Sequence, residues 1–371
     1  SGWLSWAGTL PTFHHGRTLS DPTVEPHHQS YSVRDVVSPT RSRLTTPVVI
    51  IGSIILLVVS FVVSLMLGPV TVPLGDLSSS PIVTEIRAPR IIIAALVGSA
   101  LAVSGAIMQT VFHNPLADPG IVGVSSGAAV AAVLAIVTGA SFFGEWTVPF
   151  SAFVGALITV AVVYLIASSR AMDGRGADPA TLVLVGMAIT AFLGAVISAA
   201  TANAPQDSEL RSVAFWLNGD LVSRTWDHVG VSFIPIILGL ILAIGASRDL
   251  NLMLLGESTA QTSGLNVGRA RVLLLALAAL LTATAVAVSG TITFIGLVVP
   301  HLIRIVLGAD HRALLPTAAL LGATFVIIAD TVARLLFSPI VLQTGVVVAF
   351  IGSPIFLYLL LAMRKRRGLG L

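Results

Sequence analysis

The stretch VVIIGSIILLVVSFVVSLML, residues 48–67, decides the fold class of this chain. Its twenty residues carry no charge, and a helix of that length crosses the roughly 30 Å hydrocarbon layer of a membrane. Similar apolar runs follow it, separated by short polar segments. We therefore predict ten membrane-spanning helices. Their expected ranges are 48–67, 90–110, 120–138, 146–168, 180–202, 229–247, 270–289, 292–307, 313–336 and 340–362.

The composition agrees with this prediction and excludes a soluble globule. Of the 371 residues, 55% are hydrophobic and only 10% are charged, whereas soluble domains carry about 25% charged residues. The chain has no cysteine, so disulfides, thiol nucleophiles and cysteine-based metal sites are excluded. The sequence predicts an all-α, polytopic membrane protein without a metal site.

The N-terminal segment differs from the rest of the chain. Residues 1–47 are rich in Pro, Ser, Thr and His and contain no apolar run of spanning length. We expect a flexible cytosolic tail over residues 1–47 and a transmembrane domain over residues 48–371. No charged segment leads into an apolar one near the start, so we expect no signal peptide.

The basic residues predict the orientation of the spans. With the N-terminus inside, 15 of the 20 Lys and Arg residues fall in inside segments. The external residues are Arg87, Arg90, Arg211, Arg224 and Arg334. Because basic residues are enriched on the cytoplasmic side, we expect both termini to be cytoplasmic.

Two stripes of small residues recur at helical spacing. They are Gly98, Ala102 and Ala106 in the second span, and Gly123, Gly127 and Ala131 in the third. Small residues allow helices to approach closely, which is the favoured interpretation. The alternative is the wall of a wide transport pathway.

Charges inside the spans are few. Asp330 and Arg334 are four residues apart, so they share a helix face and can pair. No second carboxylate in a span could form a proton relay with Asp330, which argues against an ion-coupled carrier. Arg87 and Arg90 lie at the outer end of the second span, either as membrane anchors or as a site for an acidic external partner.

Two predicted cytoplasmic segments could have specific roles. Residues 113–120 join the second and third spans as a tight turn or as a constriction. In the segment 247–271, apolar residues such as Leu255 occur where water is expected, and Gly256 and Gly264 bracket a short helix. That helix could dock a soluble subunit, or it could pack on its own membrane domain.

The chain lacks the sequence features of an enzyme. It has no Gly-x-x-x-x-Gly-Lys phosphate loop, so we expect no ATPase site. No Ser, His and Asp residues are arranged as a catalytic triad, and the basic residues are spread over short loops rather than gathered for nucleic acid.

Over roughly residues 50–365, the chain resembles the FecCD family, the permease subunits of type II ABC importers for iron chelates and cobalamin. The resemblance rests on motifs that occur in order. These are Arg87-Ala-Pro-Arg90, Ser104-Gly-Ala-Ile-Met-Gln109, Asn114-Pro-Leu-Ala-Asp-Pro119 with Gly123, Leu255-Gly-Glu257 through Gly264, Gly290-Thr-Ile-Thr-Phe-Ile-Gly-Leu-Val-Val-Pro-His301 with Arg304, Asp310-His-Arg312, Leu315-Pro316, Ala329-Asp330 with Ala333-Arg334, and Gly352-Ser-Pro354.

The resemblance implies a permease in the bacterial cytoplasmic membrane that moves a bulky iron chelate, either a ferric siderophore or haem. Cobalamin is an alternative substrate. An ion-coupled secondary transporter and a non-transporting membrane scaffold are alternative classes. The implied partners are a second permease subunit, expected to be identical, two cytosolic ATPase subunits that bind ATP, and an external binding protein. No cofactor is implied in this chain.

The resemblance also implies roles for single residues. Acidic residues of the binding protein would meet Arg87, Arg90 and Arg334. The cytoplasmic gate would contain Asn114 and Leu116. Contacts with the ATPases would involve Leu255, Gly256, Glu257, Ala260 and Gly264. One segment departs from the family: residues 341–345 read Val-Leu-Gln-Thr-Gly, where Leu-Pro-x-Gly is common and often follows Glu.

Overall fold

The computed structural model describes residues 45–169, 178–337 and 340–368. The predicted tail therefore lies outside the described residues except for residues 45–47. Those three residues, predicted to belong to the tail, form the start of the first helix instead.

Ten apolar helices follow one another along the described chain, which confirms the predicted order of spans. They are α1 (Thr45–Met66), α2 (Ala88–Val111), α3 (Val124–Val137), α4 (Thr147–Ser168), α5 (Pro179–Ala202), α7 (Trp226–Gly245), α10 (Val267–Ser289), α11 (Ile295–Leu307), α12 (His311–Leu335) and α13 (Thr344–Gly368). Eight are long enough to cross a membrane, while α3 and α11 are shorter.

The short helix α11 follows a stretch of backbone that is not helical. Its 13 residues extend about 20 Å at 1.5 Å per residue, too short to cross the hydrocarbon layer alone. Gly290 and Phe294, which precede it, both have positive φ angles, of 68° and 67°. Non-helical backbone at such a depth is tolerated where it is buried in protein or lines a polar cavity.

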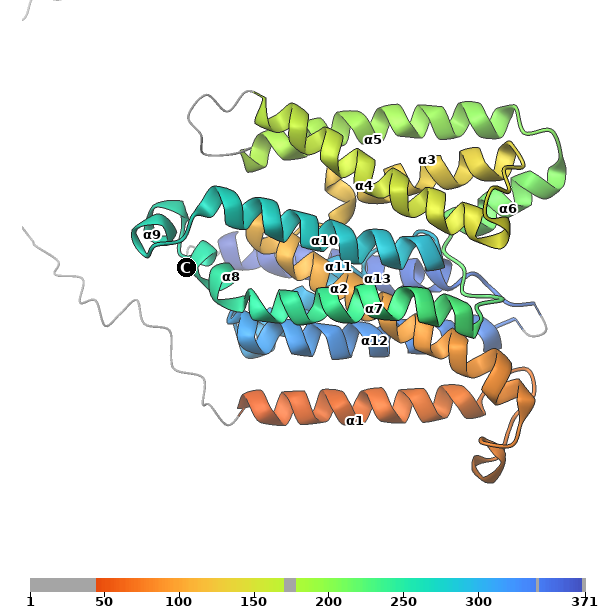
Figure 1. Ribbon diagram of the computed structural model, residues 1–371. Coiled ribbons are helices and arrows are strands. Elements are labelled where there is room, and N and C mark those ends of the chain that lie inside the picture. Colours follow the sequence, from red (N-terminus) through yellow and green to blue (C-terminus); the bar gives the residue numbers. More distant parts are fainter. Residues whose placement is uncertain (1–44, 170–177, 338–339, 369–371) are drawn as a thin grey trace, which may run out of the picture. The chain divides into compact units, whose positions relative to one another are not determined.

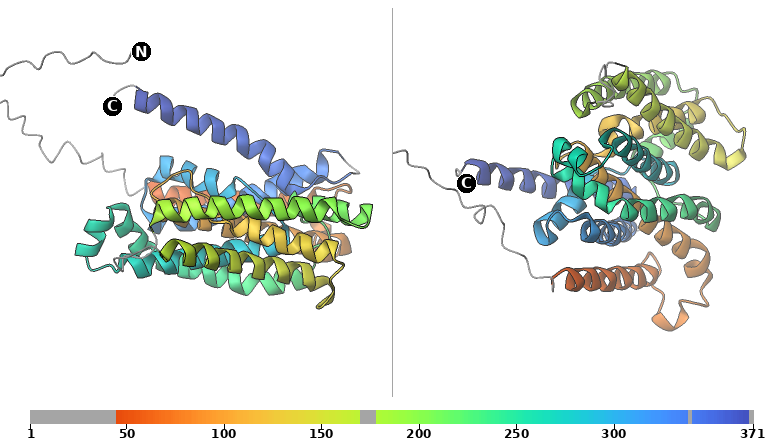
Figure 2. Two further views of the ribbon diagram at one scale, coloured as in Figure 1. Left: turned by 90° about the horizontal axis from the view of Figure 1, so that it is seen from above. Right: turned by 60° about the vertical axis from the view of Figure 1, so that its left-hand side comes forward.

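Helix α2 lies at the centre of the bundle (Figures 1 and 2) and contacts α7, α10, α11 and α12. In the most apolar stretch of α2, 89% is buried within the chain, against 11% in that of α1. Helix α1 lies at one edge, where it packs on α12, and α3, α4 and α5 pack together at the opposite edge. The central position of α2 makes its polar residues the natural place for interhelical bonds.

Both stripes of small residues pack helix against helix, as the favoured interpretation predicted. A Cβ atom on Gly98 would lie 2.1 Å from the carbonyl oxygen of Gly322 in α12, and one on Gly105 would lie equally close to that of Gly296 in α11. In the second stripe, a Cβ on Gly127 would lie 2.6 Å from the carbonyl oxygen of Gly155 in α4.

Three further α-helices of the described chain lie outside the spans. They are α6 (Asp207–Leu217), α8 (Ser247–Leu254) and α9 (Glu257–Thr262). The predicted helix between Gly256 and Gly264 corresponds to α9. Helices α8 and α9, the start of α1 and the end of α13 lie at one end of the bundle, and α6 lies at the other (Figure 1). We call these the α9 end and the α6 end.

Candidate functional site

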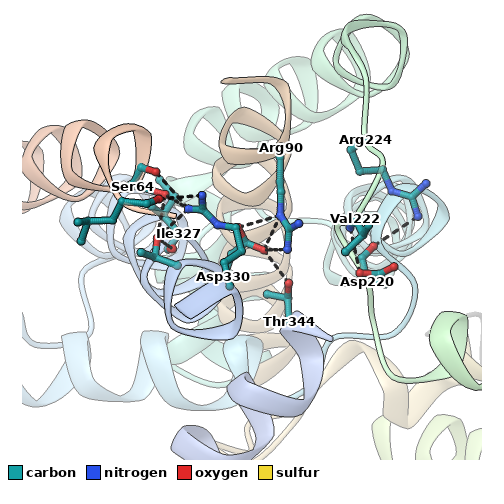
Figure 3. Close-up of polar contacts among 11 residues, drawn as sticks. Ser64, Arg90, Asp220, Val222, Arg224, Ile327, Asp330 and Thr344 are labelled. Carbon is teal, nitrogen blue, oxygen red and sulfur yellow. Dashed lines mark hydrogen bonds and ion pairs between the residues drawn. The ribbon is translucent and has the colours of Figure 1, made fainter. Parts of the chain in front are cut away.

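Arg90, Asp330 and Arg334 form a buried charge cluster near the α6 end; Figure 3 labels Arg90 and Asp330. The carboxylate of Asp330 in α12 accepts hydrogen bonds from Nε and Nη2 of Arg90 in α2, at 3.0 and 2.8 Å. Arg334 Nε lies 3.2 Å from the Oδ2 atom of Asp330, and the Thr344 hydroxyl donates to Oδ1 at 2.8 Å. The charge cluster therefore ties α2, α12 and the start of α13 together, and it confirms the predicted pair of Asp330 and Arg334.

Two arginines close the end of α1. Arg334 and Arg87 donate to the backbone carbonyls of residues 64–67 at 2.7 to 3.2 Å. Arg87 also donates to the carbonyl of Val70. The last carbonyls of a helix lack partners within it and carry its negative dipole end, so guanidinium groups are well suited to this position.

The three arginines predicted to dock a binding protein thus lie together, but they are buried. Arg87, Arg90 and Arg334 are 4%, 7% and 4% exposed. They line a hollow of about 310 Å³ whose other walls are Pro69, Val70, Ile82, Ile86 and Val341. Arg90 and Arg334 share the carboxylate of Asp330 there, and Arg87 adds a third positive charge, which leaves an excess of positive charge. Their role in docking stays a prediction.

Helix α8 has one face packed on the bundle and one exposed corner. Leu250 and Met253 are buried, while Leu254 and Leu255 are exposed, Leu255 to 63%. The segment packs on its own membrane domain, as one interpretation predicted. It also exposes leucine side chains, which the other interpretation, docking of a soluble subunit, requires.

The predicted contact residues around α9 fall into two groups. Gly256 and Gly264 have positive φ angles of 94° and 86° and set the turns on either side of α9. Ala260 is fully buried, so it cannot lie on a docking face without rearrangement. Glu257 is paired with Arg271 in α10, which holds α9 against the bundle. Leu255 remains the most exposed apolar member of the set.

The two predicted gate residues form a turn at the α9 end. The side-chain oxygen of Asn114 accepts the N–H of Leu116 at 2.9 Å, and Asp118 Oδ1 accepts the N–H of Gly120 at 2.8 Å at the start of a short 3₁₀ helix. Burial raises the pKa of the Asp118 carboxyl, although the bond from Gly120 opposes the rise. The turn is confirmed, and the gate stays a prediction.

A second hollow, of about 340 Å³, lies between the end of α6, the stretch before α11 and the start of α13. Its walls are Leu217, Asn218, Thr291, Thr293, Gly345, Val346, Ala349, Phe350 and Ser353. None of these residues is charged, and Phe350 is 76% exposed. The wall combines neutral hydrogen-bonding groups with an aromatic ring, which suits a large amphipathic solute.

The sequence did not reveal several of these polar contacts. Arg90 and Asp330 are 240 positions apart, so no helical spacing relates them. Thr344 lies in the segment that departs from the family pattern, and only the fold brings its hydroxyl to Asp330. Arg304 in α11 donates to the side chain of Gln109 in α2. The one available signal was a polar side chain inside an apolar run.

Comparison with known proteins supports a transport function. Residues 55–362 match the model of a protein family described as the FecCD transport family. A cobalamin import system permease protein, BtuC, of Halobacterium salinarum is 46% identical over 280 residues, covering 75% of this chain and 73% of that protein. A hemin transport system permease protein, HmuU, of Yersinia pestis is 44% identical over 283 residues, covering 76% and 84%.

A solved structure agrees with the sequence relatives. It is an inward-facing conformation of an ABC transporter assigned to the metal-chelate type, with a TM-score of 0.78 and 34% identity. The match covers 85% of this chain and 99% of the other. The chain belongs to the FecCD transport family and is a multi-pass membrane permease of the ABC importer type.

Proposed function

We propose that this chain is the translocation subunit of an ATP-driven importer for a bulky iron chelate, a ferric siderophore or haem. The observation that carries the proposal is the uncharged hollow beside α13. Asn218, Thr293 and Ser353 offer weak neutral bonds beside the ring of Phe350, so a large solute can be guided without being held tightly. The relative from Yersinia pestis is a hemin permease.

Cobalamin is the second candidate, because the relative from Halobacterium salinarum is a cobalamin permease. An ion-coupled carrier fits less well. Asp330 is bonded by Arg90 and Thr344 and paired with Arg334, so its carboxylate is committed to structure rather than to a proton cycle.

The test is uptake of haemin, a ferric hydroxamate siderophore and cyanocobalamin in parallel by liposomes. The liposomes contain the chain alone or together with its ATPase subunits and binding protein. We expect uptake of one iron chelate, only with the ATPases and only with ATP. Uptake by the chain alone would overturn the ATP-driven assignment, and uptake of cyanocobalamin alone would replace the substrate.

We further propose that a second copy of the chain faces the hollow across α13 and completes the pathway, with Asn114 and Leu116 as its gate at the α9 end. Because the chain has no cysteine, Phe350→Cys gives a single thiol on the exposed face of α13. We expect disulfide-linked dimers with this variant. Val58→Cys on the exposed face of α1 is the control and should form no disulfide-linked dimer under the same oxidation.

The α9 end is proposed to face the cytoplasm, with both termini on that side and with α8 and α9 docked on the ATPases. Leu255→Arg should reduce co-purification of the ATPase subunits, because it places a charge in an apolar contact. Leu74→Arg, an equally exposed leucine at the α6 end, is the control. Equal co-purification of both variants would contradict the docking assignment.

The hollow that contains Arg87, Arg90 and Arg334 is proposed to receive an acidic side chain of the binding protein. The variants Ile86→Glu and Ile86→Lys change the charge at its rim without touching the charge cluster. We expect slower association with Glu and faster association with Lys, and both changes should shrink with added salt. Equal association rates for the two variants would exclude docking at this hollow.

A further inference from the structure

A chain of hydrogen bonds crosses four helices at the α9 end, and it is separate from the charge cluster. It begins at Arg304 in α11 and passes through Thr110 in α2 and His311 in α12 to Asn251 in α8. Thr110 and His311 are fully buried. We call these four residues, with Asp310 at the far end, the polar chain.

The orientation of Asn251 fixes the polarity of one half of this chain. Its amide nitrogen donates to Asp310 Oδ1 at 2.7 Å, and its oxygen accepts the backbone N–H of His311 at 2.9 Å. The same oxygen lies 2.8 Å from His311 Nδ1, so Nδ1 must carry a hydrogen. In a neutral imidazole Nε2 is then an acceptor.

The other half follows from this assignment. His311 Nε2 lies 2.7 Å from the Thr110 hydroxyl, which therefore donates its one hydrogen to Nε2 rather than to the carbonyl of Ala106, 3.0 Å from the same oxygen. The same hydroxyl oxygen accepts from Arg304 Nη2 at 3.3 Å. Every donor thus points the same way, from the guanidinium of Arg304 toward the carboxylate of Asp310. Hydrogen bonds aligned in this manner polarise and strengthen one another.

The polar chain continues to the wall of the uncharged hollow. Arg304 also donates to the side-chain oxygen of Gln109, whose amide donates to the carbonyl of Gly296 at 3.0 Å. Gly296 lies in the first turn of α11, three residues after Thr293, which lines the hollow. A continuous set of contacts therefore joins α8 to the stretch that forms one wall of the pathway.

We propose that Asn251, His311 and Thr110 are positioning residues that carry movement of α8 to α11 and so to the hollow. The inference rests on the proposed docking of the ATPases at α8 and α9. A buried donor or acceptor left without its partner is costly, so α8 cannot shift alone without breaking the chain. Displacement of α8 by an ATPase therefore displaces α2, α11 and the start of α12 together. The Thr110 hydroxyl connects these three helices, because it lies in α2 and bonds His311 of α12 and Arg304 of α11.

The experiment measures accessibility of the hollow in the complete complex with its ATPase subunits. Thr293→Cys supplies the single thiol in a chain without cysteine, and its reaction rate with a water-soluble maleimide is compared with and without ATP. Thr110→Val removes the hydroxyl at nearly constant volume, and Thr110→Ser keeps it. Thr317→Val is the matched control. Within the described residues, the buried Thr317 hydroxyl bonds the carbonyl of Ala313 in its own helix and no other group.

In the Thr293→Cys background we expect ATP to change the labelling rate at least about fivefold, the lower end of ordinary coupling between sites. Thr110→Val should abolish that change while ATPase co-purification and ATP hydrolysis persist. Thr110→Ser and Thr317→Val should retain it. If ATP still changed the labelling rate in Thr110→Val as it does in the background, the proposed role of the polar chain would be overturned. If the background itself fails to respond to ATP, the proposed function fails instead.

A second variant covers the case in which Thr110→Val does not assemble. Asn251→Ala alters the half-buried end of the chain in α8 and should likewise abolish the response. Because Asn251 and Thr110 belong to the same polar chain, the double variant Asn251→Ala with Thr110→Val should lose no more of the ATP response than either single variant. Additive partial losses would show two independent contacts and would contradict the proposal.

Discussion

The charge cluster and the polar chain both join α2 to α12, but they do so with different chemistry. In the charge cluster, one carboxylate is held by several donors from Arg90, Arg334 and Thr344. In the polar chain, single bonds between neutral groups follow one another from Thr110 to Asn251. Removing one member of a buried ion pair is far more costly than removing one neutral bond. The α6 end is therefore built for rigidity, and the α9 end for transmission.

The largest effect is expected when the charge cluster loses its only carboxylate. Asp330→Asn leaves Arg90 and Arg334 buried without a counter-charge. We expect a loss of about 3–5 kcal/mol in the free energy of unfolding, measured by denaturant unfolding in detergent. A loss below about 1 kcal/mol would mean that the cluster is solvated in the membrane-embedded protein, and the contrast between the two ends would fail.

A smaller loss is expected from the arginine that closes α1. Arg87→Leu removes bonds to the carbonyls of Leu65 and Met66 but strands no opposite charge. Hydrogen bonds to charged groups contribute about 1.5–3 kcal/mol, and we expect a loss in that range in the same unfolding assay. A loss as large as that of Asp330→Asn would show that Arg87 belongs to the charge cluster energetically.

Two buried hydroxyls offer the most direct comparison of the two regions. Thr344→Val removes a 2.8 Å bond to the Asp330 carboxylate. Thr110→Val removes a neutral bond to His311 together with the long, 3.3 Å bond from Arg304. We expect losses of about 1.5–3 and 0.5–1.5 kcal/mol respectively. Measured side by side, a reversed order would contradict the assignment of rigidity to the α6 end.

The smallest effect concerns pH. Burial alone would raise the pKa of the Asp310 carboxyl, but bonds from Asn251 and the Arg312 N–H and the charge of Arg312 lower it below its ordinary 3.8. A lowered folded-state pKa contributes stability above pH 3.8 that is lost as the pH falls through the folded value. Asp310→Asn should therefore have a lower free energy of unfolding at neutral pH. That free energy should also fall less steeply than in the parent as the pH is lowered. Parallel profiles down to pH 3 would exclude a role for this carboxylate.

The ten apolar helices could be predicted because each is an uninterrupted apolar run. Their boundaries agree to within four residues except at the end of α13, which extends six residues beyond the predicted 362. The pair of Asp330 and Arg334 was equally predictable, since one turn of helix relates them. Helix α6 was not predicted, because its Asp207, Glu209 and Arg211 resemble an ordinary polar loop.

The interhelical contacts were beyond the sequence for a different reason. Thr110 and His311 are 201 positions apart, and any buried hydroxyl can satisfy itself on its own helix instead. The burial of the predicted docking arginines could not be predicted either. The sequence around an arginine at a helix end does not show whether its side chain faces water or packs against α1.

The separation of Arg90 from Asp330 also bears on how the chain is made. Synthesis adds about 5–20 residues per second, so the 240 positions between them correspond to a delay of about 10 to 50 seconds. During that time α2 is already in the membrane with a guanidinium that has no acid beside it, and the end of α1 awaits Arg334. A chain cut short before residue 330 would keep this guanidinium without its carboxylate, at the cost that a buried unpaired charge carries.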